Sequence, residues 1–203
     1  MMIKNPIHLR LEKLASWQLK LFMVCLCERM YPNFALYCQQ MNNSDDKVYK
    51  AIIDLNWESM LVKNAKINFD GQLEKLEEII PSVDDNSPYS VYPAIDACEA
   101  LSELVHSYLS GEQLVEHAIA VSRISLKTII ELESAKTGND LSENELKEYQ
   151  PILDELDVQW EIYRVLKNEK NQDLELIKGL KNDLREEQIS NIGVFLSSQT
   201  EKR

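Results

Sequence analysis

The chain has 203 residues, enough to bury roughly 70% of the surface that its unfolded form exposes without support from disulfides or metals. Its five glycines and six prolines are too few for the many turns of β-sandwiches, β-barrels and nucleotide-binding folds with glycine-rich loops. The net charge of −12, from 22 basic and 34 acidic side chains, argues against direct binding to nucleic acid.

Hydrophobic spacing predicts helices throughout the first 80 residues, and no segment alternates with the two-residue period of a strand. Pro32 lacks an amide N–H and follows a long apolar stretch, so it is expected to end one helix and begin the next. The expected helices are a short one opened by Asn5-Pro6, then Ser16 to about Arg29, Pro32 to Met41, Ser44 to about Lys63, and about Phe69 to Ile80.

The second half begins with residues 81–92, the longest stretch without a helical pattern and the expected position of an irregular loop. Two capping boxes, one around Ser110 and one around Ser142, predict helix starts. The helix after the first box is apolar on most sides, which places it near the middle of a bundle. The expected helices are Pro93 to about Leu109, Ser110 to about Lys136, Ser142 onwards with a kink or break at Pro151, and about Asp173 to Glu187, followed by a short apolar tail (189–196) that packs against them.

These elements predict an all-α fold, a single-domain bundle of about eight helices that covers residues 1–203 with an apolar helix near its centre. The longest uninterrupted apolar run, 21–27, is far shorter than the roughly 20 residues of a membrane span, and no signal-peptide cleavage site follows it. We therefore expect a cytoplasmic protein that does not bind membranes. The cysteines suit reduced core thiols, since three of the four have apolar helical neighbours: Cys25, Cys27, Cys38 and Cys98.

Acidic side chains concentrate in the middle of the chain. Between Lys75 and Arg123 there is no lysine or arginine, while nine acids occur. Asp96, Glu99 and Glu103 are three and four residues apart and so share one face of their helix. We interpret this face, with the irregular loop beside it, as a docking surface for a basic protein or peptide. The alternative is a solvated surface that only promotes solubility.

Metal chemistry finds little support in the sequence. Glu103 and His106 have the Glu-x-x-His spacing of di-iron bundles, but such sites need a second copy and further glutamates, and the chain has three histidines. A mononuclear site made by His106, His117 and a carboxylate stays an alternative. Cys25 and Cys27 would point about 200° apart on a helix, so they cannot share a metal. We predict no metal, no cofactor and no catalytic residue.

Two other classes of function stay open. The first is a small-molecule or metal-dependent enzyme with its site in a bundle cleft lined by Glu28, Arg29, Glu103 and His106, which requires distant helices to bring these side chains together. Glu28 and Arg29 otherwise predict a buried charged pair whose arginine bonds the last carbonyls of its helix. The second class is a homo-oligomeric structural unit, which needs an exposed apolar patch. No P-loop, dinucleotide-binding or nucleophile-elbow motif occurs.

Segments spread over nearly the whole chain carry a resemblance to a known family. They are Asn5–Arg10, Cys25–Asn33, Val62–Asp70, Tyr92–Cys98 with Ala100–His106, Asp157–Glu161, Glu175–Leu180 and Ser190–Gly193. On these segments the chain resembles the YjaG-like family, a group of uncharacterised cytoplasmic proteins of gammaproteobacteria. The resemblance implies an all-helical single domain. It implies no activity, cofactor or catalytic residue, so no functional residue is carried over.

Overall fold

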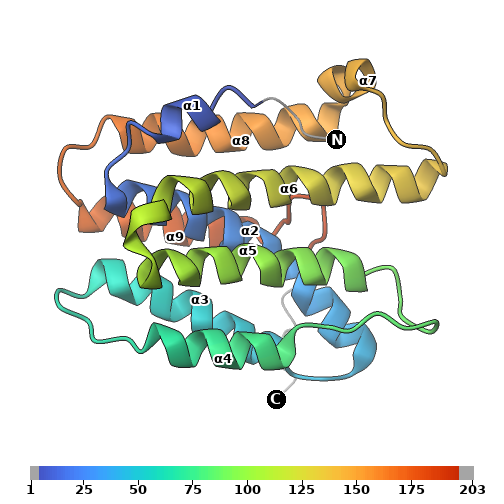
Figure 1. Cartoon of the computed structure of the whole chain (residues 1–203), viewed down its shortest axis with the longest axis horizontal. Coiled ribbons are helices and arrows are strands. Elements are labelled where there is room, and N and C mark those ends of the chain that lie inside the picture. The colour runs from blue at the N-terminus through green and yellow to red at the C-terminus, as the bar shows by residue number, and fades with distance from the viewer. Residues whose placement is uncertain (1–4, 197–203) are drawn as a thin grey trace.

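The computed structural model describes residues 5–196, which form an all-α fold, as the hydrophobic spacing predicts (Figure 1). Within this part of the chain, extended backbone pairs only at one antiparallel bridge, between Ile189 and Phe195. In chain order the helices are α1 (His8–Leu11), α2 (Ser16–Met41), α3 (Asp46–Leu61), α4 (Phe69–Ile79), α5 (Val91–Leu109), the 3₁₀ turn η1 (Gly111–Gln113), α6 (Leu114–Thr137), α7 (Glu143–Glu148), α8 (Gln150–Lys167) and α9 (Leu174–Glu187).

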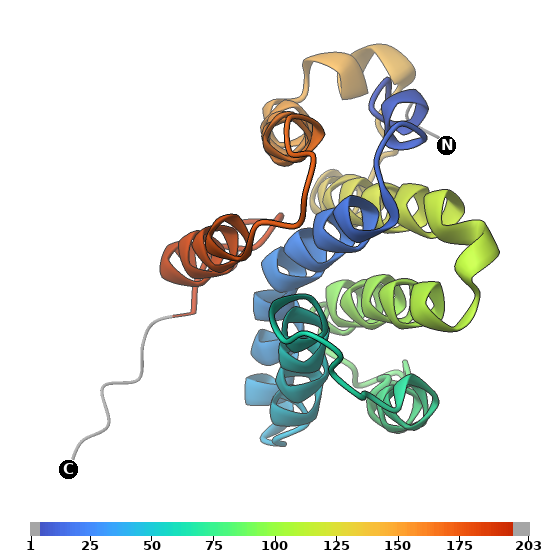
Figure 2. The ribbon, with the colours of Figure 1, turned by 90° about the vertical axis from the view of Figure 1, so that its left-hand side faces the viewer.

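The longest helix, α2, lies at the centre of the fold, between the α5–α6 pair and α9 (Figure 2). It contacts α3, α5, α6, α8 and α9. Every residue from Leu21 to Glu28 is buried, so neighbouring helices cover α2 on all sides over two turns. The predicted central apolar helix therefore exists, but it is α2. The helix assigned to that place from the sequence, α6, lies beside α2 and keeps Arg123, Lys127 and Glu131 exposed.

α2 runs through Pro32 without interruption, so the prediction of two helices meeting there is wrong. Proline holds φ near the helical value, and what the helix loses is the hydrogen bond that the missing N–H would donate, at a cost of about 3 kcal/mol. Burial of the next turn offsets this cost, because Phe34 and Cys38 are buried and the Phe34 ring stacks on Tyr49 of α3 with centroids 5.0 Å apart. Tertiary packing thus overrides the local signal of the proline.

In the second half of the chain the helices begin where the sequence predicts, with one exception. Ser142 and Glu145 form the predicted reciprocal capping box at α7, and the chain breaks at Tyr149 before Pro151 enters α8. The box predicted at Ser110 does not form, because η1 intervenes and α6 begins at Leu114 without a side-chain cap. The Ser110 hydroxyl instead donates to the His106 carbonyl at 3.1 Å and thereby caps the end of α5.

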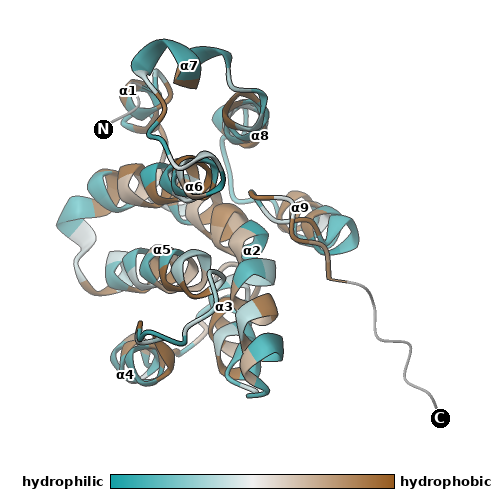
Figure 3. Ribbon diagram, turned by 90° about the vertical axis from the view of Figure 1, so that its right-hand side faces the viewer, coloured by the Kyte–Doolittle hydropathy of each residue, from teal (hydrophilic) through white to brown (hydrophobic). Residues whose placement is uncertain are grey.

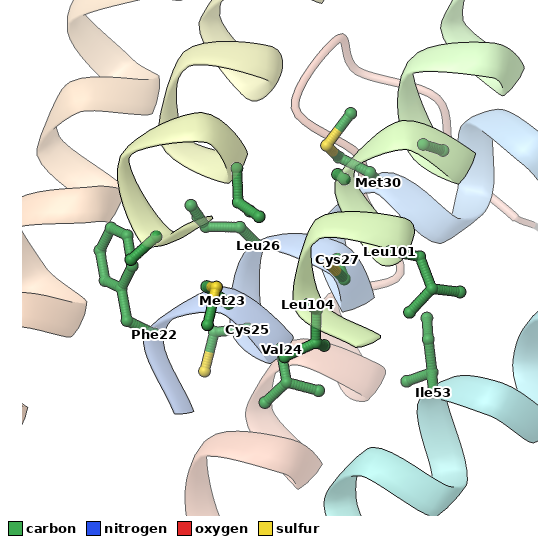
Figure 4. Close-up of a cluster of buried hydrophobic side chains, with 14 of the residues drawn as sticks. Phe22, Met23, Val24, Cys25, Leu26, Cys27, Met30, Ile53, Leu101 and Leu104 are labelled. Atoms are coloured by element: carbon green, nitrogen blue, oxygen red, sulfur yellow. The ribbon is translucent and has the colours of Figure 1, made fainter. Parts of the chain in front are cut away.

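The core surrounds α2, and hydrophobic positions gather along that helix and on the sides of its neighbours that face it (Figure 3). Side chains of α2 interlock with Ile53 from α3 and with Leu101 and Leu104 from α5 (Figure 4). One connected cluster includes side chains from α1, α2, α3, α4, α5, α6, α8 and α9. A smaller cluster joins Leu126 and Ile129 of α6 to Ile152 of α8.

The C-terminal segment packs against the bundle through polar residues and through Ile192, which contacts the smaller apolar cluster. Ser190 and Asn191 are buried, whereas Ile189 and Phe195 remain exposed. α4 ends at Ile79 and α5 begins at Val91, so residues 80–90 form the irregular connection between them. None of the helices in residues 5–196 combines the length and the hydrophobicity that a membrane crossing requires.

Candidate functional site

Asp96, the first residue of the predicted acidic face, lies in the seam between α5 and α6. Its side chain is 3% exposed. One carboxylate oxygen accepts a hydrogen bond from Lys127 Nζ and the other accepts one from Thr128 Oγ1, both at 2.8 Å. A buried carboxylate needs such partners to offset its desolvation. Asp96 therefore fastens α6 to α5 and presents no carboxylate to a binding partner.

Glu99, by contrast, is exposed beside this seam. Its carboxylate lies 3.7 Å from Lys127 Nζ, and Glu131 lies 3.9 Å from the same ammonium group. Three carboxylates thus share one cation. Partial burial, together with the charges of Asp96 and Glu99, raises the pKa of Glu131 although Lys127 acts to lower it. The seam consequently carries an excess of negative charge that further cations would relieve.

The irregular connection contributes one exposed aromatic ring and the first turn of α5 contributes another. Tyr89 is 38% exposed and Tyr92 is 46% exposed, with ring centroids 5.5 Å apart. Burial, followed by the charges of Glu131 and Asp96, raises the pKa of Tyr89. In the same loop Asp84 accepts hydrogen bonds from the backbone of Asn86 and from the Ser87 hydroxyl, so the turn is held in shape.

A hollow of about 370 Å³ opens next to the seam, between α6 and the segment that leads into α7. Lys127, Glu131 and Asp140 supply its charged lining, and Leu141 and Leu146 supply part of its apolar lining. We define the acidic–aromatic surface as the exposed side chains at this end of α5 and α6: Asp84, Asp85, Tyr89, Tyr92, Glu99 and Glu131.

Glu103, the third predicted contact, is engaged within the chain. Its carboxylate lies 2.6 Å from Nδ1 of His117, whose Nε2 lies 3.0 Å from the Ser110 hydroxyl. The rings of His106 and His117 meet edge to face with centroids 6.4 Å apart. Among residues 5–196, no group of three or more histidine, cysteine, aspartate or glutamate side chains is placed to hold a metal ion. The contact between Glu103 and His117 links α5 to α6.

Glu28 organises a second polar centre, on the side of α2 that faces α3 and α9. It is buried, yet each of its oxygens accepts two hydrogen bonds. Trp57 Nε1 donates at 2.8 Å, and Arg185 donates side-on through Nε and Nη2 at 3.0 and 3.1 Å. Lys50 donates the fourth bond. Arg185 also bonds Asp54 on the rim. Such complete partnering is what allows a carboxylate to stay charged in a protein interior.

Arg29 belongs to a third centre, because successive helical residues point about 100° apart. Its Nη2 donates to Glu155 of α8 at 3.0 Å, and the two side chains are 10% and 1% exposed. Glu155 accepts two further bonds, from Ser125 Oγ at 2.7 Å and from Gln159 at 3.3 Å. Arg29 sits within the continuous helix α2, so the prediction that it bonds the last carbonyls of its helix is wrong.

Neutral side chains extend this third centre across the bundle. Asn191 donates to the Ser125 carbonyl at 2.8 Å and accepts from Asn33 of α2 at 2.9 Å. Gln159 accepts from Ser122 at 2.6 Å and from Asn5 at 3.2 Å. The network thus ties α2, α6 and α8 to both ends of the described chain, and it holds the C-terminal segment together with the apolar contact that Ile192 makes.

The four residues of the predicted enzymatic cleft do not form one set. Glu28 faces α3 and α9, Arg29 faces α8, and Glu103 pairs with α6 through His117. Each carboxylate or guanidinium group is engaged with a different neighbour. Glu28 does line a cavity, and Arg29 lines a separate one with Glu155, but neither cavity includes Glu103 or His106.

The four cysteines are buried and free. Burial raises the pKa of every one of these thiols, and that of Cys38 reaches about 12. A protonated, enclosed thiol is a poor nucleophile and a poor metal ligand. The cysteines therefore act as packing residues.

Comparison with known proteins identifies the family of this chain. Residues 6–195 match the family described as "Protein of unknown function (DUF416)". The chain belongs to the DUF416 family. It is 58% identical to "Uncharacterized protein YjaG" of Escherichia coli (strain K12), over 96% of this chain and 98% of that protein. It is 53% identical to an "Uncharacterized protein" of Haemophilus influenzae (strain ATCC 51907 / DSM 11121 / KW20 / Rd), over 95% and 98% of the two chains. These matches confirm the resemblance to the YjaG-like family.

A solved DUF416 structure has the same fold. The crystal structure of a DUF416 family protein from Shewanella baltica OS155 superposes with a TM-score of 0.87 at 29% identity, covering 95% of this chain and all of the other. The polar centres draw on segments that carry the family resemblance: Asn5–Arg10, Cys25–Asn33, Asp157–Glu161 and Ser190–Gly193 supply Asn5, Glu28, Arg29, Asn33, Gln159 and Asn191.

The network also contains a histidine that should make stability depend on pH. His8 Nε2 lies 3.0 Å from the Ser122 hydroxyl. Burial, reinforced by the charge of Arg123, lowers the pKa of His8 from 6.5 to about 4. The neutral ring is thus favoured in the folded protein. Its contribution to stability is complete above pH 6.5 and is lost as the pH falls toward 4, where the unfolded chain binds a proton that the folded chain does not.

His8→Gln tests this dependence, because glutamine keeps a hydrogen-bonding group but does not titrate. We expect the stability advantage of the wild type over His8→Gln to shrink between about pH 7 and about pH 4, measured by urea unfolding at several pH values. An advantage that stays constant over this range would show that His8 is not held neutral.

Proposed function

We propose that this chain is a non-enzymatic binding protein whose acidic–aromatic surface docks a basic segment of a macromolecular partner. One observation carries the proposal. Of the eleven large hydrophobic side chains that are exposed in residues 5–196, four lie between residues 80 and 92, in the segment that leads into α5, and α5 also carries Glu99 of the carboxylate excess. They are Ile80, Val83, Tyr89 and Tyr92.

Charge and aromatic rings together favour a cationic partner. Lysine and arginine are attracted to the faces of tyrosine rings, and they also pair with carboxylates. Tyr89 and Tyr92 supply the rings, while Glu99 and Glu131 supply carboxylates that a single lysine leaves only partly compensated. Electrostatic complementarity of this kind speeds association and selects against acidic partners.

The hollow beside the seam gives such a partner a place for one long basic side chain. It is lined by two acids and one lysine, and its apolar walls would contact the methylene stem of lysine or arginine. These contacts revise the docking surface predicted from the sequence. Glu99 remains a contact and Asp96 supports the surface from inside the α5–α6 seam, whereas Glu103 pairs with His117 and is not part of the surface. Tyr89 and Tyr92 supply the aromatic part.

Charge reversal on the loop tests the proposal. The full-length protein, immobilised as bait in a native lysate, should retain a basic protein whose binding weakens steeply with added salt. Asp84→Lys combined with Asp85→Lys should reduce its retention at least about tenfold, since rim charges mainly set association. Asp183→Lys combined with Glu186→Lys changes the net charge equally on exposed positions of α9 and should retain the partner.

Loss of the partner from both double variants, or from neither, would contradict docking at this surface. If the surface instead binds a second copy of the chain, light scattering of the purified protein will show a mass larger than that of one chain. The proposed place of action is the cytoplasm, which the four free, buried thiols support, since reduced cysteines are typical of that compartment.

A further inference from the structure

A separate cavity lies on the other side of α2, between that helix, α3, α9 and the C-terminal segment. Its volume is about 300 Å³, which is at the lower end of small-molecule sites. Glu28, Lys50 and Arg185 line one part of it, while Pro32, Leu184 and Ile189 contribute apolar walls. The cavity therefore has a charged end and an apolar end. It does not overlap the acidic–aromatic surface.

The cations at the charged end hold hydrogen-bond donors that the protein does not use. The Nε and Nη2 groups of Arg185 bond Glu28 and Asp54, but Nη1 has no acceptor within residues 5–196. The Lys50 ammonium donates to Glu28 alone among the described acceptors, although it has three N–H groups. Two N–H groups on each cation thus lack an oxygen acceptor among the described residues, and the Lys50 ammonium lies over the Tyr31 ring, 5.1 Å from its centroid. A carboxylate accepts about four such bonds.

Basic side chains gather at the charged end of the cavity. Lys50, Lys181 and Arg185 lie near the carboxylates of Glu28 and Asp54, in a chain whose net charge is −12. A third carboxylate, that of Asp46, lies beside the Tyr31 hydroxyl of the cavity lining. Burial and the charge of Arg185 lower the pKa of Lys181, although Asp54 and Glu28 act to raise it. Burial is the largest of these causes, so the shift reports mainly the desolvation of the Lys181 ammonium group. Glu28 is fully engaged with its own donors. Asp54 accepts a hydrogen bond from Arg185 and is 47% exposed at the rim.

The apolar walls define the rest of the ligand. Pro32 is buried, Leu184 is half-buried, and Ile189 at the rim is 47% exposed although it is a large aliphatic side chain. We propose that this cavity binds a small aliphatic carboxylate, with its head group on Lys50 Nζ and Arg185 Nη1 and its chain against Pro32, Leu184 and Ile189. Binding would cover Ile189 and satisfy the remaining donors of both cations.

Hexanoate is a suitable probe, with 1-hexanol as its uncharged analogue. In isothermal titration calorimetry of the full chain, hexanoate should bind at least about tenfold more tightly than 1-hexanol, because its head group makes charge-assisted hydrogen bonds. Lys50→Met should weaken hexanoate binding by a similar factor. Lys47→Met removes an exposed lysine of the same helix that does not line the cavity, and it should bind hexanoate as the wild type does.

Trp57 offers a local readout, because its indole N–H donates to Glu28. Hexanoate should shift the indole signal of Trp57 in ¹H–¹⁵N spectra more than those of Trp17 and Trp160. An unmoved Trp57 signal, or equal affinity for hexanoate and 1-hexanol, would overturn the proposal. So would equal losses of affinity in Lys50→Met and Lys47→Met.

A second pair of variants avoids the ion-pair cluster, so that misfolding cannot mimic loss of binding. Ile189 and Phe195 are both exposed and face each other across the same bridge, but only Ile189 lines the cavity. Ile189→Glu places a negative charge at the rim and should abolish hexanoate binding, whereas Phe195→Glu should preserve it. Hexanoate binding that survives Ile189→Glu in a folded protein would also overturn the assignment.

Discussion

Arg29→Met should lower the free energy of unfolding by about 3–5 kcal/mol, which is typical of removing one partner of a buried ion pair. The variant leaves the Glu155 carboxylate, 1% exposed, with only the Ser125 hydroxyl and the Gln159 amide as donors. Desolvation of that charge would then be offset by neutral hydrogen bonds alone. Urea unfolding followed by far-UV circular dichroism measures the difference.

A double-mutant cycle distinguishes this pair from two independent residues. Arg29→Met combined with Glu155→Met should cost no more than Arg29→Met alone, because no charge then remains buried without a partner. Additive losses in the double variant would mean that the two side chains stabilise the fold separately.

Glu28→Gln should have the second largest effect, a loss of about 3 kcal/mol in the free energy of unfolding. The substitution leaves Lys50 and Arg185 without their shared counter-charge. Both cations are partly exposed, at 27% and 30%, so water can compensate them better than it can Glu155, and the loss should fall at the low end for a buried pair. Glu58→Gln, on an exposed face of α3, should change stability by no more than about 0.5 kcal/mol.

Equal stability of Glu28→Gln and Glu58→Gln in urea unfolding would show that the four donors around Glu28 do not depend on its charge. It would also weaken the carboxylate-binding assignment of the neighbouring cavity, because that assignment requires Glu28 to be fully engaged with its own partners.

The fold class and most helix positions follow from local sequence patterns. The Ser142–Glu145 box and the break before Pro151 are examples, because both depend on residues within one or two turns. Pro32 shows where such signals fail. Its local cost is real, but the burial of Phe34 and Cys38 against other helices outweighs it, and no short-range pattern reports that burial.

The candidate sites were harder to predict for a related reason. Asp96 and Glu99 look equivalent in the sequence, yet Thr128 and Lys127 draw Asp96 into the α5–α6 seam while Glu99 stays outside. Spacing along one helix identifies a face but not the partner that the face meets. The exposed tyrosines of the loop were visible only as part of an irregular segment.

The Arg29 network could not be predicted from the sequence either, because its partners come from other helices. Glu155, Gln159 and Asn191 join it from positions more than 120 residues away along the chain. The only available signal was polar residues, such as Gln159, on a helix face that is otherwise apolar. That signal predicts a buried polar group, which must be partnered, but it does not identify the partner.

Photo-crosslinking in living cells tests the proposed function most directly. A benzophenone-bearing amino acid in place of Tyr92 lies on the acidic–aromatic surface, and the same group in place of Leu9, which is 73% exposed on α1, serves as the control. We predict a covalent adduct with a basic protein from position 92 and none from position 9, and we expect Asp84→Lys with Asp85→Lys to abolish it. Identical adducts from both positions, or no adduct from position 92, would contradict docking at this surface.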